Sequence, residues 1–178
     1  MPTTKISDII NSRKDRIAIR KDYIGLFFRL IFLGVVGYLI FTQVFLVTQA
    51  KGMDMFPAIK DGDLIIGFRL QKTYQKGNII TYRLDGEQKI GRIIARETDI
   101  VTIEEEGTLR INGTVQSGEI MYPTYAKEGM SYPYNVPVDH VFVLGDYRTQ
   151  AKDSRDVGPI PVEQVEGKVI TILRRRGL

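Results

Sequence analysis

Residues 30–47 read LIFLGVVGYLIFTQVFLV, eighteen consecutive positions without a charged side chain. Residues 24–28, on the other side of Arg29, extend this apolar stretch toward the N-terminus. A helix rises about 1.5 Å per residue and needs about 20 apolar residues to cross a hydrocarbon layer of about 30 Å. The stretch is apolar all round rather than along one stripe, which favours a membrane span over a buried core helix. We therefore predict a transmembrane helix over residues 24–47.

The formal charge of the chain is concentrated before this stretch. Residues 1–29 hold seven Lys or Arg and three Asp, whereas residues 51–178 hold 18 basic and 18 acidic side chains. Positive flanks stay on the cytoplasmic side of a membrane. We therefore predict a single-pass plasma-membrane protein with a cytoplasmic basic N-terminus (residues 1–23) and an extracytoplasmic domain (residues 51–178). A cleaved signal peptide ending at Thr48-Gln49-Ala50 is the alternative, but its apolar core would be unusually long.

Composition excludes several kinds of site. The chain has no cysteine, which rules out disulfides, thiolate metal sites and a cysteine nucleophile. His140 is the only histidine, and since it leads into an apolar run we interpret it as a strand-edge residue. We predict no metal site and no cofactor. The sequence pI of about 9.2 is typical of nucleic-acid binders, but residues 51–178 are neutral overall, so we expect no nucleic-acid partner.

After residue 50 the sequence changes to short β-branched runs separated by turn residues. The runs that we predict as strands are residues 64–68, 78–82, 89–95, 100–103, 108–111, 141–144 and 169–173. The dipeptides that we predict as turns are Asp61-Gly62, Lys76-Gly77, Asp85-Gly86, Asn112-Gly113 and Gly145-Asp146. Residues 116–138 hold three prolines and four tyrosines, and we interpret them as a long loop or insertion.

Four blocks in this part of the chain resemble the motifs of the type I signal peptidase family. The blocks are GMDMFP with DGD (residues 52–57 and 61–63), GNIITYR (77–83), KIGRIIA (89–95) and VLGDYR with DSR (143–148 and 153–155). They occur in the family's order, a few residues after an N-terminal anchor, and the resemblance extends over residues 1–173. It implies a mostly β fold: a signal-peptidase-like β domain preceded by one transmembrane helix. It also implies a membrane-bound serine protease ancestry.

The sequence departs from the family pattern at the positions of the catalytic residues. The family uses a Ser nucleophile activated by a Lys base, because a hydroxyl is a weak nucleophile until a neighbouring group takes its proton. In this chain the nucleophile position is Asp54, the base position is Gly91, and the position of a serine that helps to hold the lysine is Ala151. Tyr147 replaces the Asn of the family's G-D-N-R. We therefore predict a pseudo-enzyme with no catalytic residues.

The residues that resemble the family's frame are retained. We predict as structural motif residues Gly62, Asp63, Arg92, Gly145, Asp146, Arg148, Asp153, Ser154 and Arg155. We predict that a peptide-binding groove includes Asp54, Met55, Phe56, Pro57 and Gly91, because in the family this region faces the bilayer and the substrate.

Two alternative catalytic arrangements stay open. Asp54 and a second carboxylate, from Asp63, Asp146 or Asp153, would form an aspartic-protease pair. Lys89, two residues before Gly91 on the same strand face, would lean toward the old lysine position.

The pattern as a whole resembles the non-catalytic signal-peptidase-like pilus assembly factor of Gram-positive bacteria. This resemblance implies a membrane-anchored binding or chaperone factor whose partners are the lipid bilayer and an exported protein or pilin subunit, with sortase as a further partner. The alternatives are an active signal peptidase with non-standard catalytic residues and a structural subunit paired with an active signal peptidase.

Overall fold

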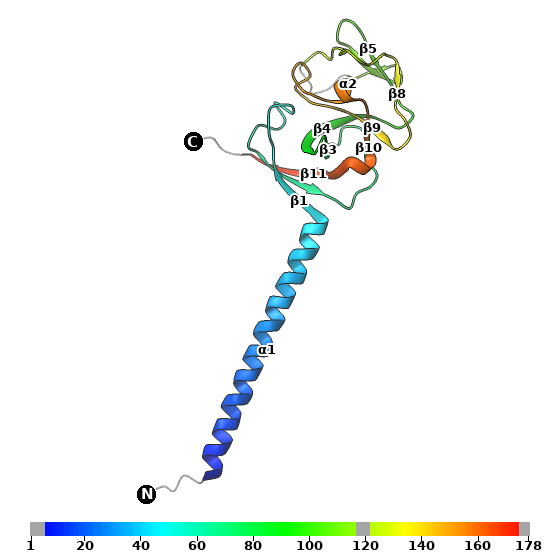
Figure 1. The fold of residues 1–178 in the computed structure, drawn as a ribbon. Helices are drawn as coiled ribbons and strands as arrows, with labels where there is room; N and C mark the ends of the chain where they lie inside the picture. The colour runs from blue at the N-terminus through cyan, green and yellow to red at the C-terminus, as the bar shows by residue number, and fades with distance from the viewer. Residues whose placement is uncertain (1–5, 117–121, 175–178) are drawn as a thin grey trace. The chain divides into compact units, whose positions relative to one another are not determined.

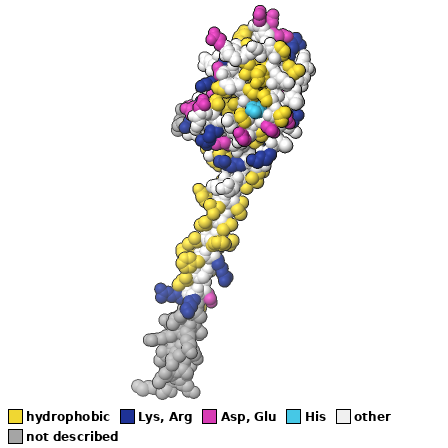
Figure 2. All heavy atoms as spheres, turned by 45° about the vertical axis from the view of Figure 1, so that its right-hand side comes forward, with side chains coloured by type: hydrophobic (Ala, Val, Ile, Leu, Met, Phe, Trp, Pro, Cys, Tyr) yellow, Lys and Arg dark blue, Asp and Glu magenta, His cyan; other side chains and the backbone are white. Residues whose placement is uncertain are grey.

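The N-terminal helix is the first of two units in the computed structural model, which describes residues 6–116 and 122–174 and side chains from residue 19 onward. The units are residues 1–43 and residues 44–178. Helix α1 (Ile6–Val44) contains a segment, Ile19–Val44, that is long and apolar enough to cross a membrane, with a mean hydropathy of 2.3 over its most apolar window. None of that window is buried within the protein, and apolar side chains line the described part of the helix (Figure 2).

Helix α1 differs from the predicted span at both ends. It starts at Ile6, so part of the predicted basic N-terminus is helical. It ends at Val44, three residues before the predicted limit, because Phe45, Leu46 and Val47 pair with a neighbouring strand. The carbonyl oxygen of Val44 also accepts a hydrogen bond from the Arg69 backbone (2.9 Å). The β unit therefore begins before the predicted start at residue 51.

The second unit is built mostly from strands (Figure 1). In chain order its elements are β1 (Phe45–Gln49), β2 (Leu64–Phe68), β3 (Ile79–Leu84), β4 (Glu87–Arg96), β5 (Ile100–Ile103), β6 (Leu109–Ile111), β7 (Thr114–Val115), β8 (Tyr134–Asn135), β9 (His140–Leu144), α2 (Ser154–Val157), β10 (Ile160–Pro161), the 3-10 turn η1 (Val162–Gln164) and β11 (Val165–Leu173). The mostly β fold class is confirmed, and each predicted strand lies within or overlaps an observed one.

The larger sheet has the order β1-β2-β11-β3-β4-β9-β10, with every neighbouring pair antiparallel. The hydroxyl of Thr48 on β1 donates to the side-chain oxygen of Gln88 on β4 (2.5 Å), although three strands separate these two in the sheet order. Register shifts in β11 and between Ile93 and Ala95 of β4 add the local twist that such curling needs. The sheet thus curls so that the end of β1 approaches the start of β4.

The smaller sheet has the order β7-β6-β5-β8. Its buried side chains, including Val101 and Ile111, pack with Phe142 and Leu144 of β9 in one core cluster. A second cluster, which includes Tyr82, Ile93 and Val143, joins β3, β4 and β9 of the larger sheet. Strand β9 contributes to both clusters because its residues from Val141 to Leu144 are buried on both faces. This strand leads directly into the VLGDYR block.

Turn chemistry explains several connections. Gly62, Gly77, Gly86 and Gly113 have φ between 78° and 87°, a region that favours glycine, as the dipeptide signals predicted. The predicted loop 116–138 contains β8, which pairs with β5, and residues 117–121 of that loop lie outside the described residues. His140 starts β9 opposite Pro161, and its Nδ1 lies 2.8 Å from the Val138 carbonyl oxygen, consistent with a residue at the end of a strand.

Candidate functional site

Asp54 lies in the turn that connects β1 to β2. Backbone hydrogen bonds from Phe56 to Met53 (2.9 Å) and from Ile59 to Met55 (2.8 Å) shape this turn. At its start, Gly52 has a φ of 81° and its N–H donates to the carboxylate of Asp61 (2.8 Å). The carbonyl oxygen of Asp54 accepts a hydrogen bond from the backbone of Tyr147 (2.9 Å), so the turn is fastened to the VLGDYR block.

The Asp54 side chain borders a small pocket between this turn and β4. The pocket has a volume of about 20 Å³, and its lining includes Ala50, Asp54, Met55, Lys89 and Ile90. This volume is about that of one water-sized sphere. Burial raises the pKa of the half-buried Asp54 carboxyl above its ordinary value, while the nearby positive charge of Lys89 partly opposes the rise. None of the described residues donates a hydrogen bond to this carboxylate.

Gly91, which the motif resemblance predicts to be the family's base position, faces a filled space. A Cβ atom there would lie 2.4 Å from Cγ1 of Val143 and 3.4 Å from the ring of Tyr82. Tyr82 pairs with Lys89 across β3 and β4, so its ring lies diagonally over Gly91. Tyr82 is 1% exposed, and this burial raises the pKa of its hydroxyl. The position cannot hold a lysine side chain unless Val143 moves.

Ala151, the predicted helper position, is fully buried. It packs against Gly145 so closely that a Cβ added to Gly145 would lie 2.3 Å from that of Ala151 and 2.5 Å from the Asp54 carbonyl oxygen. The structure thus brings positions 54, 145 and 151 together. Residue 145 is a glycine because the segments that contain Asp54 and Ala151 leave no room there for a Cβ atom.

Lys89 does reach the Asp54 pocket from the neighbouring strand. Its ammonium pairs with the exposed carboxylate of Glu87 (2.9 Å). It lines the same pocket as Asp54, whereas Tyr82 and Val143 occupy the space that a side chain at residue 91 would need. Lys89 thus lies beside the predicted base position and not in it.

The three carboxylates considered as partners of Asp54 in an aspartic-protease pair are engaged elsewhere. Asp153 accepts hydrogen bonds from the Arg155 guanidinium (2.8 and 2.9 Å) and from the Gly145 backbone (3.1 Å). Asp146 forms a bidentate pair with Arg92 (2.6 and 2.8 Å). Asp63 accepts a hydrogen bond from the backbone of Lys60 (2.9 Å). Each is held by its own donors, which disfavours a shared proton with Asp54.

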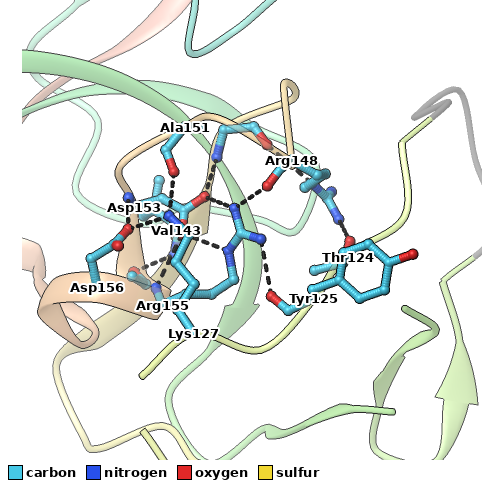
Figure 3. Close-up of polar contacts among 11 residues, drawn as sticks. Thr124, Tyr125, Lys127, Val143, Arg148, Ala151, Asp153, Arg155 and Asp156 are labelled. Atoms are coloured by element: carbon cyan, nitrogen blue, oxygen red, sulfur yellow. Dashed lines mark hydrogen bonds and ion pairs between the residues drawn. The ribbon is translucent and has the colours of Figure 1, made fainter. Parts of the chain in front are cut away.

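The frame residues predicted in the last motif block form one polar network around the end of β9, whereas Gly62 and Asp63 are hydrogen-bonded within the β1–β2 connection. Arg155 is 1% exposed, and its guanidinium donates to Asp153 and to the carbonyl oxygens of Arg148 (2.6 Å) and Tyr125 (3.1 Å), as Figure 3 shows. The hydroxyl of Ser154 accepts the Val143 N–H (2.9 Å). Asp153 also caps helix α2. These bonds fix the backbone around Gly145 and Ala151, which lies next to Asp54.

Arg148 is the other buried arginine of this network. Its guanidinium donates to the Gly145 carbonyl oxygen (3.0 Å) and to the Thr124 hydroxyl (2.5 Å). Burial lowers its pKa to about 10, although Asp146 opposes the shift. The arginine therefore ties residues 122–125 to the VLGDYR block.

The remaining groove residues differ in exposure. Met55 is buried in a cluster with Ile59 and Ile65, Phe56 is half-buried, and Pro57 is exposed. The ring of Phe56 lies 5.9 Å from that of Tyr147, which lies 4.9 Å from that of Tyr122.

Two contributors to this region carried no signal in the sequence. Tyr122 and Lys127 come from the predicted irregular loop, where no motif pointed to a role. The ammonium of Lys127 donates to the Ala151 carbonyl oxygen (2.6 Å) and to Asp156 (2.7 Å). Only the folded chain brings these residues to the site.

The described residues contain no group of three or more His, Cys, Asp or Glu side chains that is placed to hold a metal ion. The expected absence of a cofactor stays a prediction.

Comparisons with known proteins identify relatives of this architecture. A family model for signal peptidase, peptidase S26, matches residues 21–173. Signal peptidase IB of Staphylococcus aureus is 29% identical over 140 residues, covering 67% of this chain and 72% of the relative. Thylakoidal processing peptidase 1 of Arabidopsis thaliana is 29% identical over 135 residues, 65% of this chain and 38% of the relative.

Two further matches have the same family character. The mitochondrial ATP-independent inner membrane protease subunit 1b of Arabidopsis thaliana is 28% identical over 128 residues, 68% of this chain and 65% of the relative, so the chain spans only part of either Arabidopsis protein. A crystal structure of a signal peptidase I from Enterococcus faecalis V583 aligns with a TM-score of 0.47 and 27% identity, covering 56% of this chain and 97% of that one. The family model extends over most of the sequence, from α1 through β11. This chain belongs to the signal peptidase family, peptidase S26.

Proposed function

We propose that this chain is a membrane-anchored, catalytically inactive signal peptidase homologue that binds an exported protein. The proposal rests mainly on the packing around residue 91. It has no side chain, and Val143 and Tyr82 fill the space that a base would need. A lysine base works only when it is held close to the hydroxyl that it activates. At residue 54 there is a carboxylate and no hydroxyl.

The binding half of the proposal rests on what surrounds Asp54. A partly desolvated carboxylate without a donor among the described residues borders a pocket at the end of β1. Because the Asp54 side chain is half-buried and not enclosed, a ligand that donates a hydrogen bond can still reach its carboxylate. An extended peptide lying along this pocket would supply backbone N–H donors, as in strand-addition complexes.

The identity of the partner follows from the resemblance to the pilus assembly factor. On that basis the partner is a pilin subunit, held at the plasma membrane while sortase joins subunits. The same proposal has residues 1–23 in the cytoplasm and the β unit outside, following the distribution of positive charge. The apolar segment Ile19–Val44 provides the anchor.

An active signal peptidase with non-standard residues is the second candidate. The named relatives are peptidases, and Asp54 and Lys89 share one pocket. Asp54 would have to act as a base toward water, because Lys89 has no hydroxyl at residue 54 to activate.

The test is a cleavage and binding assay on the full chain in detergent micelles. A labelled signal-peptide substrate is incubated with the unaltered chain, with Asp54→Ser/Gly91→Lys, and with Signal peptidase IB of Staphylococcus aureus as the positive control. The unaltered chain should bind the peptide without cleaving it. Cleavage by the double variant alone would indicate a protease frame whose chemistry has been removed.

Two results count against the proposal. Cleavage by the unaltered chain, abolished by Asp54→Asn, would establish the active-peptidase alternative. Binding neither to the signal peptide nor to a purified pilin subunit would reject the binding role. Co-purification with an active signal peptidase and with no pilin would favour a structural subunit instead.

A further inference from the structure

A chain of hydrogen bonds connects Lys127 to the backbone of Asp54. The Lys127 ammonium donates to the Ala151 carbonyl oxygen (2.6 Å). The Ala151 N–H donates to the Tyr147 carbonyl oxygen (2.9 Å), and the Tyr147 N–H donates to the Asp54 carbonyl oxygen (2.9 Å). Residues 147–151 therefore form a turn that contacts Lys127 at one end and Asp54 at the other.

The same turn is held at its other end by an aromatic contact. The ring of Tyr122 lies 4.9 Å from that of Tyr147, with the two planes inclined by 44°. Tyr122 and Lys127 belong to one short segment, residues 122–127. That segment is itself anchored, because Thr124 accepts a hydrogen bond from Arg148 and the Tyr125 carbonyl oxygen accepts one from Arg155 (Figure 3).

The ammonium of Lys127 lies in a restricted position rather than in open solvent. Its side chain is 27% exposed, and it also pairs with Asp156 (2.7 Å), which forms part of the cap of α2. Hydrogen bonds of charged donors are about twice as strong as neutral ones. Figure 3 shows Lys127, Ala151 and Asp156 as neighbours. One side chain thus joins residues 122–127, the 147–151 turn and the start of α2.

The charged and titratable groups around Asp54 come from four elements. They are Lys89 on β4, Tyr82 on β3, Asp153 and Asp156 at α2, and Lys127. Since Gly91 contributes no charge, Lys89 and Lys127 are the cations that act on Asp54 within this set. Lys127 reaches the helper position from a segment outside the four motif blocks.

We propose that Lys127 and Tyr122 are positioning residues that clamp the 147–151 turn and so set the place and the charge environment of Asp54 for peptide binding. The proposal rests on the binding role proposed above. It assigns a function to residues 122–127, which lie outside the four motif blocks.

The test uses the full chain in lipid nanodiscs with carboxyl-¹³C-labelled aspartate. Lys127→Met is compared with Lys127→Arg and with Lys76→Met, a matched control that removes a lysine from another carboxylate pair, with Asp99 (3.0 Å). The Asp54 signal, assigned by its absence in Asp54→Asn, should titrate at higher pH in Lys127→Met. It should be nearly unchanged in Lys76→Met and close to the unaltered position in Lys127→Arg.

Binding of a synthetic signal peptide provides the second measurement. Loss of one charge-assisted hydrogen bond that positions the site should weaken binding about tenfold in Lys127→Met. Tyr122→Leu should weaken binding several-fold and leave the Asp54 titration almost unchanged, because it removes only the ring contact. This variant also tests the clamp if Lys127→Met does not fold.

The outcomes separate the two proposals. An unchanged Asp54 titration together with unchanged binding in Lys127→Met would overturn the clamp. If the unaltered chain does not bind the peptide, the binding role fails. The clamp is then judged on the Asp54 titration and on amide-exchange protection of residues 147–151, which should fall in Lys127→Met and not in Lys76→Met.

Discussion

The ion pair between Arg155 and Asp153 should be the most costly contact of the site region to break. Both side chains are nearly inaccessible, with exposed fractions of 1% and 2%. The guanidinium makes two bonds to the carboxylate and two to carbonyl oxygens, and the carboxylate also accepts from the Gly145 backbone. Asp153→Asn or Arg155→Met leaves the remaining partner buried without its counter-charge.

The magnitude follows from burial. Removing one member of a buried ion pair costs about 3–5 kcal/mol, because the other charge stays desolvated. A domain of this size is stable by about 5–15 kcal/mol, so the loss is a large share of the total. At about 1.4 kcal/mol per factor of ten, the ratio of folded to unfolded chain should fall roughly a hundred- to several-thousand-fold. The pair Arg83–Glu166 is the matched control, because Arg83 is 57% exposed and such pairs contribute about 0–1 kcal/mol.

Urea unfolding of the full chain in micelles measures this difference. The chain has nine tyrosines and no tryptophan, so near-ultraviolet circular dichroism of tyrosine can follow tertiary packing. Arg155→Met and Asp153→Asn should lower the unfolding midpoint strongly, and Arg83→Met should barely change it. Equal losses in Arg155→Met and Arg83→Met would refute the argument from burial. A double variant, Arg155→Met/Asp153→Asn, should lose less than the sum of the single variants.

Three further predictions concern the same unit. Burial raises the pKa of Asp54, so its ionised form destabilises the fold. Asp54→Asn should therefore raise the thermal unfolding midpoint at pH 7, and this gain should shrink as the pH falls toward the ordinary pKa of 3.8. A gain that does not change with pH would contradict the raised pKa. Gly145→Ala should lose about 1–3 kcal/mol in urea unfolding because its Cβ meets Ala151 and a backbone oxygen, while Gly67→Ala, whose nearest contact is 3.4 Å, should lose less. Deleting residues 1–50 should leave a β unit that is less stable and aggregates more than deletion of residues 1–43, as size-exclusion chromatography would detect, because β1 pairs along β2.

The sequence was most informative where local chemistry decides structure. Residues 64–68 and 100–103 coincide with β2 and β5, and Asn112-Gly113 forms the expected turn with both φ values positive. The short strands β7, β8 and β10 were missed because two residues carry no periodicity. Strand β1 was missed because residues 45–47 continue an apolar run. Only their pairing with β2 distinguishes them from the helix.

Motif comparison predicted which residues form the site but not which side chains fill it. It placed Asp54, Gly91 and Ala151 near one another, yet it did not reveal that Tyr82 and Val143 fill the position facing Gly91. That fact depends on the register of β3 against β4 and of β4 against β9. The contribution of Lys127 depends on a long loop, whose path no local pattern specifies.

The predicted nucleophile and base positions, residues 54 and 91, differ in a way that bears on the proposed function. A lysine kept neutral in apolar surroundings is a costly feature, maintained where catalysis needs it. Residue 91 carries no such cost, because its glycine allows Val143 and Tyr82 to pack tightly. At residue 54 a cost remains, since the carboxylate is partly desolvated and accepts no hydrogen bond from the described residues. Breaches of local packing rules persist mainly at functional sites. A bound peptide that donates an N–H to Asp54 would remove this cost, which is why we assign Asp54 to recognition and Gly91 to the fold.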